Sequence, residues 1–462
     1  MHFGLFHYNG TMGYEEGFEA FNNGDYRRAA QLLERAATQS GYASDLINHT
    51  FTLALYRARE HQRLADVAFR VGSGLVDVDP GSAMDYFQRA VQAGLDPGRV
   101  RRIGEVFEEW SGDRVPGKLR GKVTRVAHVV RSMSAGQPIS LYMRMLEESL
   151  KGQGIESFIF STEATSSWFW NPAPAAGVEG DFVQRSDRLA EAVREAAVQL
   201  VFYHANLSDQ IAARVASLHP APVQVNVNHD AEMDADLFDG FIHLSQNSLE
   251  RSRFKARPSV WIPSSSDVEE RIQSNLFQTR AGLGVDSAST VSASFSGLAR
   301  DHSGFLKVLV ELLKRFPSHF HFFAGASDVR AIRGMLHSEG VLSRLRFLGE
   351  TVDTTPLLGA IDLLLVPFPD TGGIAVLDVM GAGKPVIAMR HATNIEFNTA
   401  AELVGDPLLT PGTGAEYLSA ADRLLRDPAS RERMGGKSVE RFRKEFAPEK
   451  LGERYAQFME QL

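Results

Sequence analysis

Hydrophobic and polar residues follow two different patterns along this chain, and the change falls near Lys122. Before it, apolar and small residues recur at helical spacing, without the alternation typical of strands. After it, short apolar runs of the kind found in buried strands alternate with amphipathic stretches, as in Val123 to Val130 followed by Ser140 to Lys151. Alternation of this kind predicts parallel sheets covered by helices. We therefore expect an all-α region followed by α/β domains.

The first region has the pattern of short paired helices. Its clearest segment runs from Gly17 through Ala20 and Gly24 to Ala29, with small residues where two antiparallel helices would touch. The segment resembles a tetratricopeptide repeat, and weaker copies follow it. We predict a helical domain of this kind at residues 1–118. Because so few repeats make a poor solenoid, an irregular helical cap packed on the next domain is the alternative.

Two α/β blocks follow one another. Strands are expected at 123–130, 157–161, 200–203, 223–227 and 241–245 in the first block, and at 291–296, 319–323, 344–348, 363–366 and 385–388 in the second. The polar segment Ser264 to Gln278 between them predicts an interdomain crossing. We place two Rossmann-like domains at 119–278 and 279–462, with a C-terminal helix from about Glu449 returning to the first. Open α/β sheets bind ligands at the carboxyl ends of their strands, so a cleft between the domains is the expected binding site.

The composition is that of a soluble globular protein, and it excludes several kinds of site. The 462 residues carry 49 basic and 57 acidic side chains, a net charge of −8, which argues against binding to nucleic acid or anionic membranes. Without any cysteine there are no thiolate zinc sites, iron–sulfur clusters or cysteine nucleophiles. No run approaches the roughly 20 apolar residues of a membrane span, and the start lacks the features of a signal peptide. We expect a cytoplasmic protein.

The most informative segment runs from Leu363 to Val386. An apolar strand enters a loop that ends in Gly372 and Gly373, and a helix follows at once. The first backbone N–H groups of a helix are open, with the positive end of the helix dipole behind them, which suits a diphosphate. One turn into the helix, Asp378 could accept hydrogen bonds from a ribose. A plain strand–loop–helix unit with a solvated Asp378 is the alternative.

Three other motifs carry less weight. Gly381 to Pro385 lacks the first glycine and the Ser/Thr of a phosphate loop, so we interpret it as a helix-to-strand turn. Asp234 and Asp236 have the spacing of a metal-binding pair, but such pairs occur by chance, and we predict no metal site. His319 and His321 share one face of a strand and are expected to be satisfied core or cleft-wall residues.

Residues 363–386 resemble the donor-site segment of glycosyltransferase family 41, which comprises the protein O-GlcNAc transferases and the adhesin N-glucosyltransferases. In that family a Gly-Gly-Thr-Thr-Thr stretch precedes an invariant Asp and a Gly-x-Pro turn. The positions that match are Gly372, Gly373 and Asp378, and the threonines are replaced by Ile374, Ala375 and Val376. The resemblance implies that the backbone at the two glycines, Ile374 and Ala375 surrounds the diphosphate.

Two further stretches are similar to the same family. His219 to Val225, followed by Leu237 to Ile242, resembles its Arg-Pro-Ala-Pro-Ile-Gln strand and its later Phe-Met-Asp-Tyr-Ile-Ile, in the same order and spacing. Phe295 to Arg300 stands where the family has Phe-Asn-Gln-x-x-Lys, whose Lys contacts the donor diphosphate. The resemblance therefore implies that Arg300 binds the diphosphate, which a guanidinium does through paired hydrogen bonds.

The resemblance covers most of the chain and implies a GT-B fold, in which two Rossmann-like domains face a cleft, preceded by a tetratricopeptide-like domain. It implies an inverting transfer of a sugar from a nucleotide sugar, of the UDP type, to a protein. The reaction of this family needs no metal ion, and the nucleotide sugar is a substrate, with no further cofactor. The helical N-terminal domain would hold the protein acceptor.

The acceptor side departs from the family pattern. The O-GlcNAc transferases carry Asn-His-Pro-Thr-Ser after the first strand, with the His near the acceptor, and this chain has Gln137 there. Gln137 can orient a hydroxyl or an amide but cannot take a proton at neutral pH. The replacements we expect at the cleft are His204, which ends one predicted strand, and the pair His229 and Asp230, which follows the next. Each could be the base, since a histidine beside a carboxylate titrates near neutrality, or could bind substrate without proton transfer.

Two other functions fit parts of the pattern. Asp370 and Asp378 have the spacing of the Glu-x7-Glu pair of retaining GT-B enzymes that act on glycans or lipids. A catalytically silent scaffold, which uses its helical array to hold a partner, fits the loss of the acceptor-side His. The configuration of the product separates the first alternative from an inverting enzyme, and turnover of a nucleotide sugar separates the second.

Overall fold

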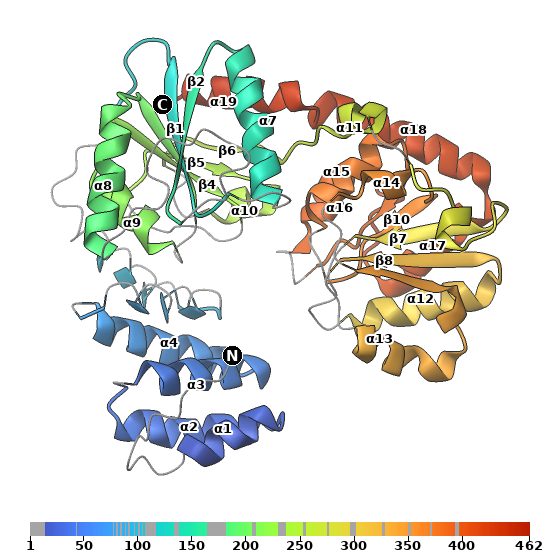
Figure 1. Ribbon diagram of the computed structural model, residues 1–462, viewed down its shortest axis with the longest axis horizontal. Coiled ribbons are helices and arrows are strands. Elements are labelled where there is room, and N and C mark those ends of the chain that lie inside the picture. The colour runs from blue at the N-terminus through green and yellow to red at the C-terminus, as the bar shows by residue number, and fades with distance from the viewer. Residues whose placement is uncertain are drawn as a thin grey trace.

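Three parts follow one another along the chain (Figure 1), and a helical block lies beneath the first of two α/β domains, with the second domain beside them. The computed structural model describes residues 14–42, 44–76, 78–79, 82–83, 86–87, 89–90, 93–96, 98–99, 102–103, 105–106, 117–133, 138–163, 182–205, 209–229, 237–252, 256–274, 277–295, 302–325, 329–349, 353–369, 372–392 and 397–462. The two sheets are separate, so the chain contains two α/β domains as its hydrophobic pattern predicts.

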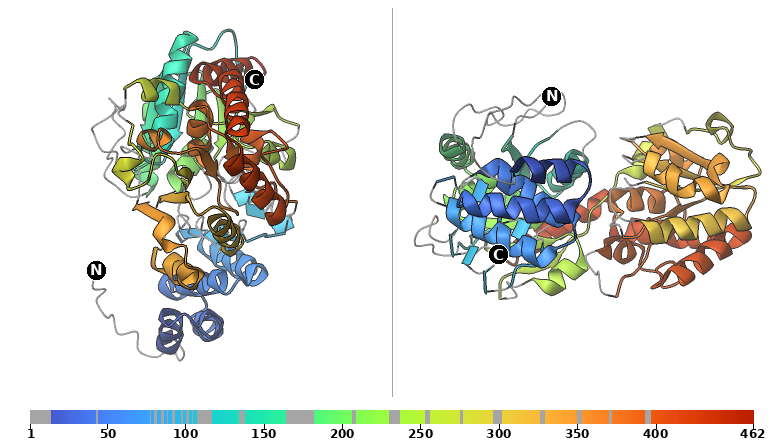
Figure 2. Two further views of the ribbon diagram at one scale, coloured as in Figure 1. Left: turned by 90° about the vertical axis from the view of Figure 1, so that its right-hand side faces the viewer. Right: turned by 90° about the horizontal axis from the view of Figure 1, so that it is seen from below.

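Helices fill the N-terminal block. Those described there are α1 (Tyr14–Asn22), α2 (Tyr26–Gln39), α3 (Asp45–Arg57) and α4 (His61–Leu75). Each packs on the next along the chain, and they lie roughly parallel or antiparallel when seen from below (Figure 2). A Cβ atom at Gly17 would lie 2.8 Å from Leu33 Cγ, so the first two helices touch where the sequence places a small residue. The block fits a tetratricopeptide-like domain.

The first α/β domain is built on a parallel sheet of six strands within the described residues, in the order β2-β1-β3-β4-β5-β6. The strands are β1 (Arg125–Val130), β2 (Glu156–Ser161), β3 (Leu200–His204), β4 (Val223–Asn228), β5 (Gly240–His243) and β6 (Ser259–Trp261). The helices are α7 (Pro138–Gly152), α8 (Phe182–Glu195), α9 (Gln210–Ser217) and α10 (Gln246–Arg251). The short strand β6 and the helix α10 are the elements that the hydrophobic pattern did not predict.

The second α/β domain has a parallel sheet of five strands among its described residues, in the order β11-β10-β7-β8-β9. The strands are β7 (Thr290–Ser294), β8 (His319–Ala324), β9 (Leu345–Gly349), β10 (Leu363–Leu365) and β11 (Val386–Ile387). The helices are α12 (Ser303–Arg315), α13 (Val329–Leu336), α14 (Thr355–Leu358), α15 (Gly373–Gly381), α16 (Thr399–Val404), α17 (Gly414–Arg426) and α18 (Pro428–Glu445), and short 3₁₀ turns lie at Ala281–Leu283, His337–Glu339 and Leu342–Arg344.

The chain crosses between the α/β domains twice, and the two crossings are bonded to each other. The first contains α11 (Val268–Ser274), and the second joins α18 to α19 (Pro448–Met459). Ser265 Oγ donates to the carbonyl oxygen of Phe446 at 2.6 Å. Helix α19 then packs on α7, and the Tyr142 and Tyr455 hydroxyls meet at 2.8 Å, so the C-terminal helix belongs to the core of the first domain.

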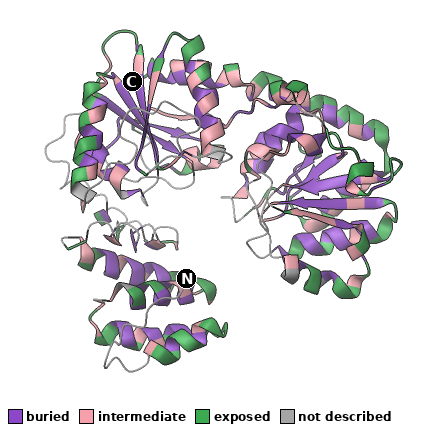
Figure 3. Ribbon diagram, in the orientation of Figure 1, coloured by how far each residue is buried: buried purple, intermediate pink, exposed green. Residues whose placement is uncertain are grey.

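Apolar side chains form three buried clusters, and most strands and inner helix faces of both domains are buried (Figure 3). One cluster fills the second domain, and another lies between the first sheet and the helices α7 and α19. The remaining cluster joins the helical block to the other face of the first sheet, since it contains both Phe87 and Phe238. The helical block therefore packs on the first α/β domain as well as forming paired helices.

Candidate functional site

The N-terminus of α15 is open to solvent, and its shape depends on two glycines. Gly372 has φ 71° and Gly373 has φ 54°, values in the left-handed region that glycine adopts without strain. A Cβ atom at Gly372 would lie 2.6 Å from Val376 Cγ2, so a larger residue would not fit. No side chain caps the helix, Gly373 is exposed, and Ile374 and Ala375 are half-buried. Backbone N–H groups with a helix dipole behind them are thus available to an anion.

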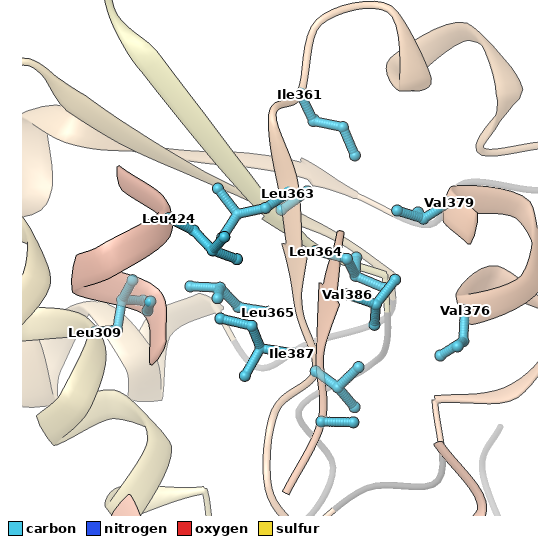
Figure 4. Packing of buried hydrophobic residues seen from close by; sticks show 14 of the residues in the cluster. Leu309, Ile361, Leu363, Leu364, Leu365, Val376, Val379, Val386, Ile387 and Leu424 are labelled. Atoms are coloured by element: carbon cyan, nitrogen blue, oxygen red, sulfur yellow. The ribbon is translucent and has the colours of Figure 1, made fainter. Parts of the chain in front are cut away.

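The rest of α15 is fixed in the core. Val376 and Val379 point from the helix toward Leu364 and Val386 on the neighbouring strands (Figure 4). All four residues are at most 2% exposed. Because the inner face is buried this fully, the exposed end of the helix is held rigidly at the carboxyl end of β10. Ile374, Ala375 and Val376 have no polar side-chain atoms, so the backbone is the source of polar contacts at this end.

The carboxylate of Asp378 is buried and already engaged by three side chains. Its Oδ1 accepts from Ser266 Oγ and from Arg271 Nη2, both at 2.5 Å, and its Oδ2 accepts from Thr354 Oγ1 at 3.0 Å. Burial raises the pKa of the Asp378 carboxyl, and the Arg271 guanidinium opposes that shift. The contact with a ribose stays a prediction, and a ribose hydroxyl would share the remaining lone pairs of the carboxylate.

Arg271 makes Asp378 part of the interdomain crossing, which the sequence did not indicate. Its guanidinium also pairs with Asp267 at 2.6 Å and with Asp353 at 2.9 Å. Asp267 in turn pairs with Arg144 of α7 in the first domain at 2.5 Å. A continuous set of ion pairs therefore runs from the first domain through α11 to the helix that begins at the two glycines.

On the first domain, three histidines form a file along the sheet. His128 Nδ1 lies 3.0 Å from His204 Nε2, and His204 Nδ1 lies 3.0 Å from His229 Nε2. Strand side chains alternate between faces, and these three fall on the face covered by α7 and α19. His229, just past the end of β4, is half-buried, while His128 is 0% and His204 6% exposed. The file leads from the interior to the carboxyl edge of the sheet.

Tyr142 of α7 covers the outer part of this file. Its ring meets the rings of His204 and His229 edge to face, with centroids 5.9 and 5.3 Å apart. The Tyr142 hydroxyl bonds to Tyr455 of α19, so the C-terminal helix supports the cover. Burial lowers the pKa of His128 to about 3 and of His229 to about 4, and it lowers that of His204 as well. All three rings are neutral at pH 7.

The prediction that His204 faces the cleft is wrong. Both of its ring nitrogens are occupied by other histidines, and its side chain is buried under Tyr142. It cannot contact an acceptor directly. His229 keeps Nδ1 for a ligand, because its contact with His204 uses Nε2. Gln137, Asp230 and Arg300 lie outside the described residues, as do Asp234, Asp236 and Asp370.

Residues missed at the sequence level are His128, Tyr142 and Arg271. Each lies in a predicted helix or strand, where the hydrophobic pattern indicated an ordinary core or surface position and gave no reason to expect a role at a site. The period-two alternation in β1 and β3 does place His128 and His204 on one face, which was the available signal.

The segment from His219 to Val225, which resembles family 41, is held in place by hydrogen bonds of Gln224. The Gln224 side chain accepts from the Tyr203 hydroxyl at 2.7 Å and donates to the carbonyl oxygens of Ala216 and Leu237. Its backbone N–H donates to Asp239 Oδ2 at 2.8 Å. These bonds fasten β4 to the loops around it. The motif therefore fixes the amino end of β4, at the opposite end of the strand from His229.

His319 and His321 are satisfied core residues, as predicted. Both are 0% exposed and bond to hydroxyls on β7, with Ser292 Oγ 2.9 Å from His319 Nε2 and 2.7 Å from His321 Nδ1. Gly381 to Pro385 forms the predicted helix-to-strand turn. Within the described ranges, no cluster of three or more His, Asp or Glu side chains is arranged to bind a metal ion.

The carboxyl edges of the two sheets meet across a direct contact. Glu402 of α16 accepts from the backbone N–H groups of Gln246 at 2.8 Å and Asn247 at 3.1 Å. These residues begin α10, which follows β5 of the first domain. Since α16 follows β11 of the second domain, this contact joins segments that follow strands of both sheets.

Residues 295–427 match a family model described as glycosyl transferases group 1. The matched segment contains α15 and most of the second domain. A comparison with curated proteins finds no match. The second α/β domain is thus similar in sequence to glycosyl transferases group 1 over most of its length.

Solved structures share the architecture. A point mutant of an O-GlcNAc transferase of Thermobaculum terrenum is 16% identical over 97% of this chain and 90% of its own, with a TM-score of 0.59. A glycosyltransferase of Rickettsia africae is 12% identical over 74% and 98%, with a TM-score of 0.57. Anabaena HepE in complex with UDP and glucose is 16% identical over 73% and 100%, with a TM-score of 0.52. At these identities the likeness is one of fold, and it confirms the GT-B arrangement.

The GT-B fold and the group 1 domain together support a transferase. In the part of the chain that the structure describes, no helix has the length and apolar character needed to cross a bilayer.

Proposed function

We propose that this chain is a cytoplasmic glycosyltransferase of the family 41 type, which transfers a sugar from a UDP sugar to a side chain of a protein. The transfer inverts the anomeric carbon and needs no metal ion. The observation that carries the proposal is the uncapped, exposed start of α15, which lies within the segment that matches glycosyl transferases group 1. HepE, of the same fold, binds UDP and glucose.

The donor side uses backbone groups. As the diphosphate departs it gains negative charge, which the N–H groups from Gly373 to Ala375 and the Arg300 guanidinium would stabilise. In the sequence, Arg300 follows β7 by six residues. Asp378 is placed one turn further along, where it fixes the helix to the crossing and offers lone pairs to a ribose.

The acceptor side is the carboxyl edge of the first sheet. His229 is a described residue there with a ring nitrogen left for a ligand. In the sequence, Gln137 directly precedes α7 and Asp230 directly follows His229. The helical block packs against this domain, and its exposed Leu46 and Tyr56 offer an apolar surface to a polypeptide. We therefore assign the block to holding the protein acceptor.

The experiment that tests the donor site removes a single N–H group. Proline is tolerated in the first turn of a helix and lacks this donor, so Ile374→Pro removes one contact and leaves the helix intact. We expect turnover of the UDP sugar to fall by about 10²- to 10³-fold, the usual cost of losing such a donor. Ile374→Ala is the control, since it keeps the N–H group. UDP release from UDP-glucose and UDP-N-acetylglucosamine is measured, with intact mass of co-expressed proteins to detect transfer.

A wild-type protein that releases no UDP from any UDP sugar, in the presence of protein acceptors, would contradict the proposal and leave the scaffold function. Turnover that EDTA abolishes and Mg²⁺ restores would contradict a metal-independent reaction. Product of retained configuration would favour the glycan or lipid enzyme that the Asp370 and Asp378 spacing fits.

A further inference from the structure

The file of His128, His204 and His229 has only two possible proton arrangements. Each ring contact at 3.0 Å needs one N–H group and one lone pair, and each neutral ring has one of each. If His204 carries its proton on Nδ1, then His128 and His229 carry theirs on Nδ1 as well. If His204 carries it on Nε2, all three carry it on Nε2. The two arrangements cannot mix.

The inner end of the file distinguishes the two arrangements. His128 Nε2 is buried, and no described residue forms a hydrogen bond with it. The ring is stacked on Phe202, with centroids 5.3 Å apart, in a wholly buried position. In the Nε2 arrangement this nitrogen would carry an N–H group without an acceptor. Buried N–H groups without partners are rarer than buried acceptors without partners, so the Nδ1 arrangement is the stable one.

We propose that His128 is a positioning residue that, through His204, fixes the proton of His229 on Nδ1, so that His229 offers an N–H group to a ligand oxygen in the cleft. The ligand rests on the proposed function: an oxygen of the UDP sugar or of the acceptor that has a free lone pair. His128 touches no substrate and acts only through the file.

The same arrangement assigns the general base to another group. To take a proton at Nδ1, His229 must first carry its own on Nε2, which reverses the whole file and leaves an N–H group on His128 Nε2 inside the core. Burial, which lowers the pKa of His229 to about 4, also disfavours a cation at this position. His229 therefore binds and polarises an oxygen instead of deprotonating an acceptor.

The direct test is the protonation pattern of the rings in the wild-type protein. Long-range ¹H–¹⁵N correlation spectra of ¹⁵N-histidine-labelled protein at pH 7 distinguish a protonated Nδ1 from a protonated Nε2. Signals are assigned by their loss in His204→Phe and His229→Phe. We expect protonated Nδ1 in all three rings, and a protonated Nε2 in His204 or His229 would overturn the proposal. This measurement needs no enzymatic activity, so its failure is separate from that of the proposed function.

A pair of variants tests the role of His128 in turnover. His128→Asn keeps an N–H donor near the position of Nδ1, and His128→Leu removes it. We expect kcat to fall about 10- to 100-fold in His128→Leu and to recover in His128→Asn, with KM for the UDP sugar within about twofold in both. His319→Leu is the control, because it removes a buried, hydrogen-bonded histidine from the other sheet. Equal kcat in His128→Leu and wild type, or equal losses in His128→Leu and His128→Asn, would contradict a positioning role.

Discussion

Arg271 Nη2 and Asp378 Oδ1 lie 2.5 Å apart and join the interdomain helix α11 to the helix whose start faces the cleft. Their side chains are 16% and 7% exposed, so the pair is shielded from water. The residue that the sequence suggested as a ribose ligand is thus also a structural anchor. A movement of α15 and a movement of the interdomain crossing would therefore both alter the contact between Arg271 and Asp378.

Replacing Arg271 should destabilise the protein, because it leaves the Asp378 carboxylate buried without its counter-charge. We expect Arg271→Met to lower the free energy of unfolding by about 3–5 kcal/mol, the usual effect of removing one partner of a buried pair. Urea denaturation measures it. Lys314→Met, which breaks an exposed pair with Glu339, is the control and should cost about 1 kcal/mol or less. Equal losses in the two variants would contradict a stabilising role for the buried pair.

UDP titration separates the two roles of Asp378. A hydrogen bond to a charged group contributes about 1.5–3 kcal/mol, so a ribose contact predicts that Asp378→Ala weakens UDP binding by about 10- to 100-fold. Arg271→Met removes the anchor but keeps the carboxylate, and we expect it to weaken UDP binding less. Calorimetry on the folded variants measures both. The same loss in both variants would mean that Asp378 acts on UDP only through the crossing.

Glu402 should restrain the width of the cleft. Its carboxylate is the acceptor for two backbone N–H groups of the other domain, and Glu402→Ala removes both bonds. Because the chain contains no cysteine, spin labels on Glu191→Cys and Glu432→Cys report the distance between the domains without background. We expect a broader distance distribution in Glu402→Ala. Glu416→Ala is the control, because the Glu416 carboxylate accepts from the Gly412 N–H group within the second domain, and it should leave the distance distribution unchanged. A distance distribution in Glu402→Ala that equals the wild-type distribution would contradict the restraint.

The buried histidines should make stability fall as the solution becomes acidic. Burial lowers the pKa of His128 to about 3 and of His229 to about 4 in the folded chain, against about 6.5 when unfolded. Between these values only the unfolded state binds the proton, so the stability present above pH 6.5 is lost as the pH falls toward 4. Each such histidine contributes a slope of about 1.4 kcal/mol per pH unit.

Removing one of these histidines should reduce the pH dependence. We expect His128→Phe to lower the slope of unfolding free energy against pH between about 6 and 4 by the contribution of one proton. Denaturation in urea at several pH values measures the slope. The exposed His337→Phe is the control. A slope in His128→Phe that equals the wild-type slope would contradict the neutral state of the file.

If the helical block holds the protein acceptor, its exposed apolar residues should affect transfer and leave donor turnover unchanged. Leu46 and Tyr56 of α3 are 59% and 55% exposed. We expect the double variant Leu46→Ser, Tyr56→Ser to reduce transfer to protein several-fold while UDP sugar hydrolysis stays at the wild-type rate. Leu408→Ser, at a 53% exposed leucine of the second domain, is the control. Unchanged transfer in the double variant would contradict acceptor binding by this surface and favour the alternative, a helical cap that only packs on the first α/β domain.

The hydrophobic pattern by itself determined the order of elements, the two parallel sheets and the strand–glycine–helix unit at Gly372. These depend on local periodicity and on backbone conformations that only glycine adopts, so they can be predicted from neighbouring residues. The short strand β6 was missed because three residues carry too little periodicity. The turn at Gly383 and the core positions of His319 and His321 were predicted for the same local reasons.

Tertiary structure alone decided which side chains meet. Asp378 and Arg271 are 107 residues apart, and His128 and His204 are 76 apart, so no local pattern records either contact. His204 satisfies the sequence criteria for a cleft residue, yet neighbouring strands place a histidine at each of its nitrogens and α7 places Tyr142 over it. A strand pattern fixes the face on which a side chain lies, whereas register and the packing of distant helices fix its partners, its burial and therefore its protonation.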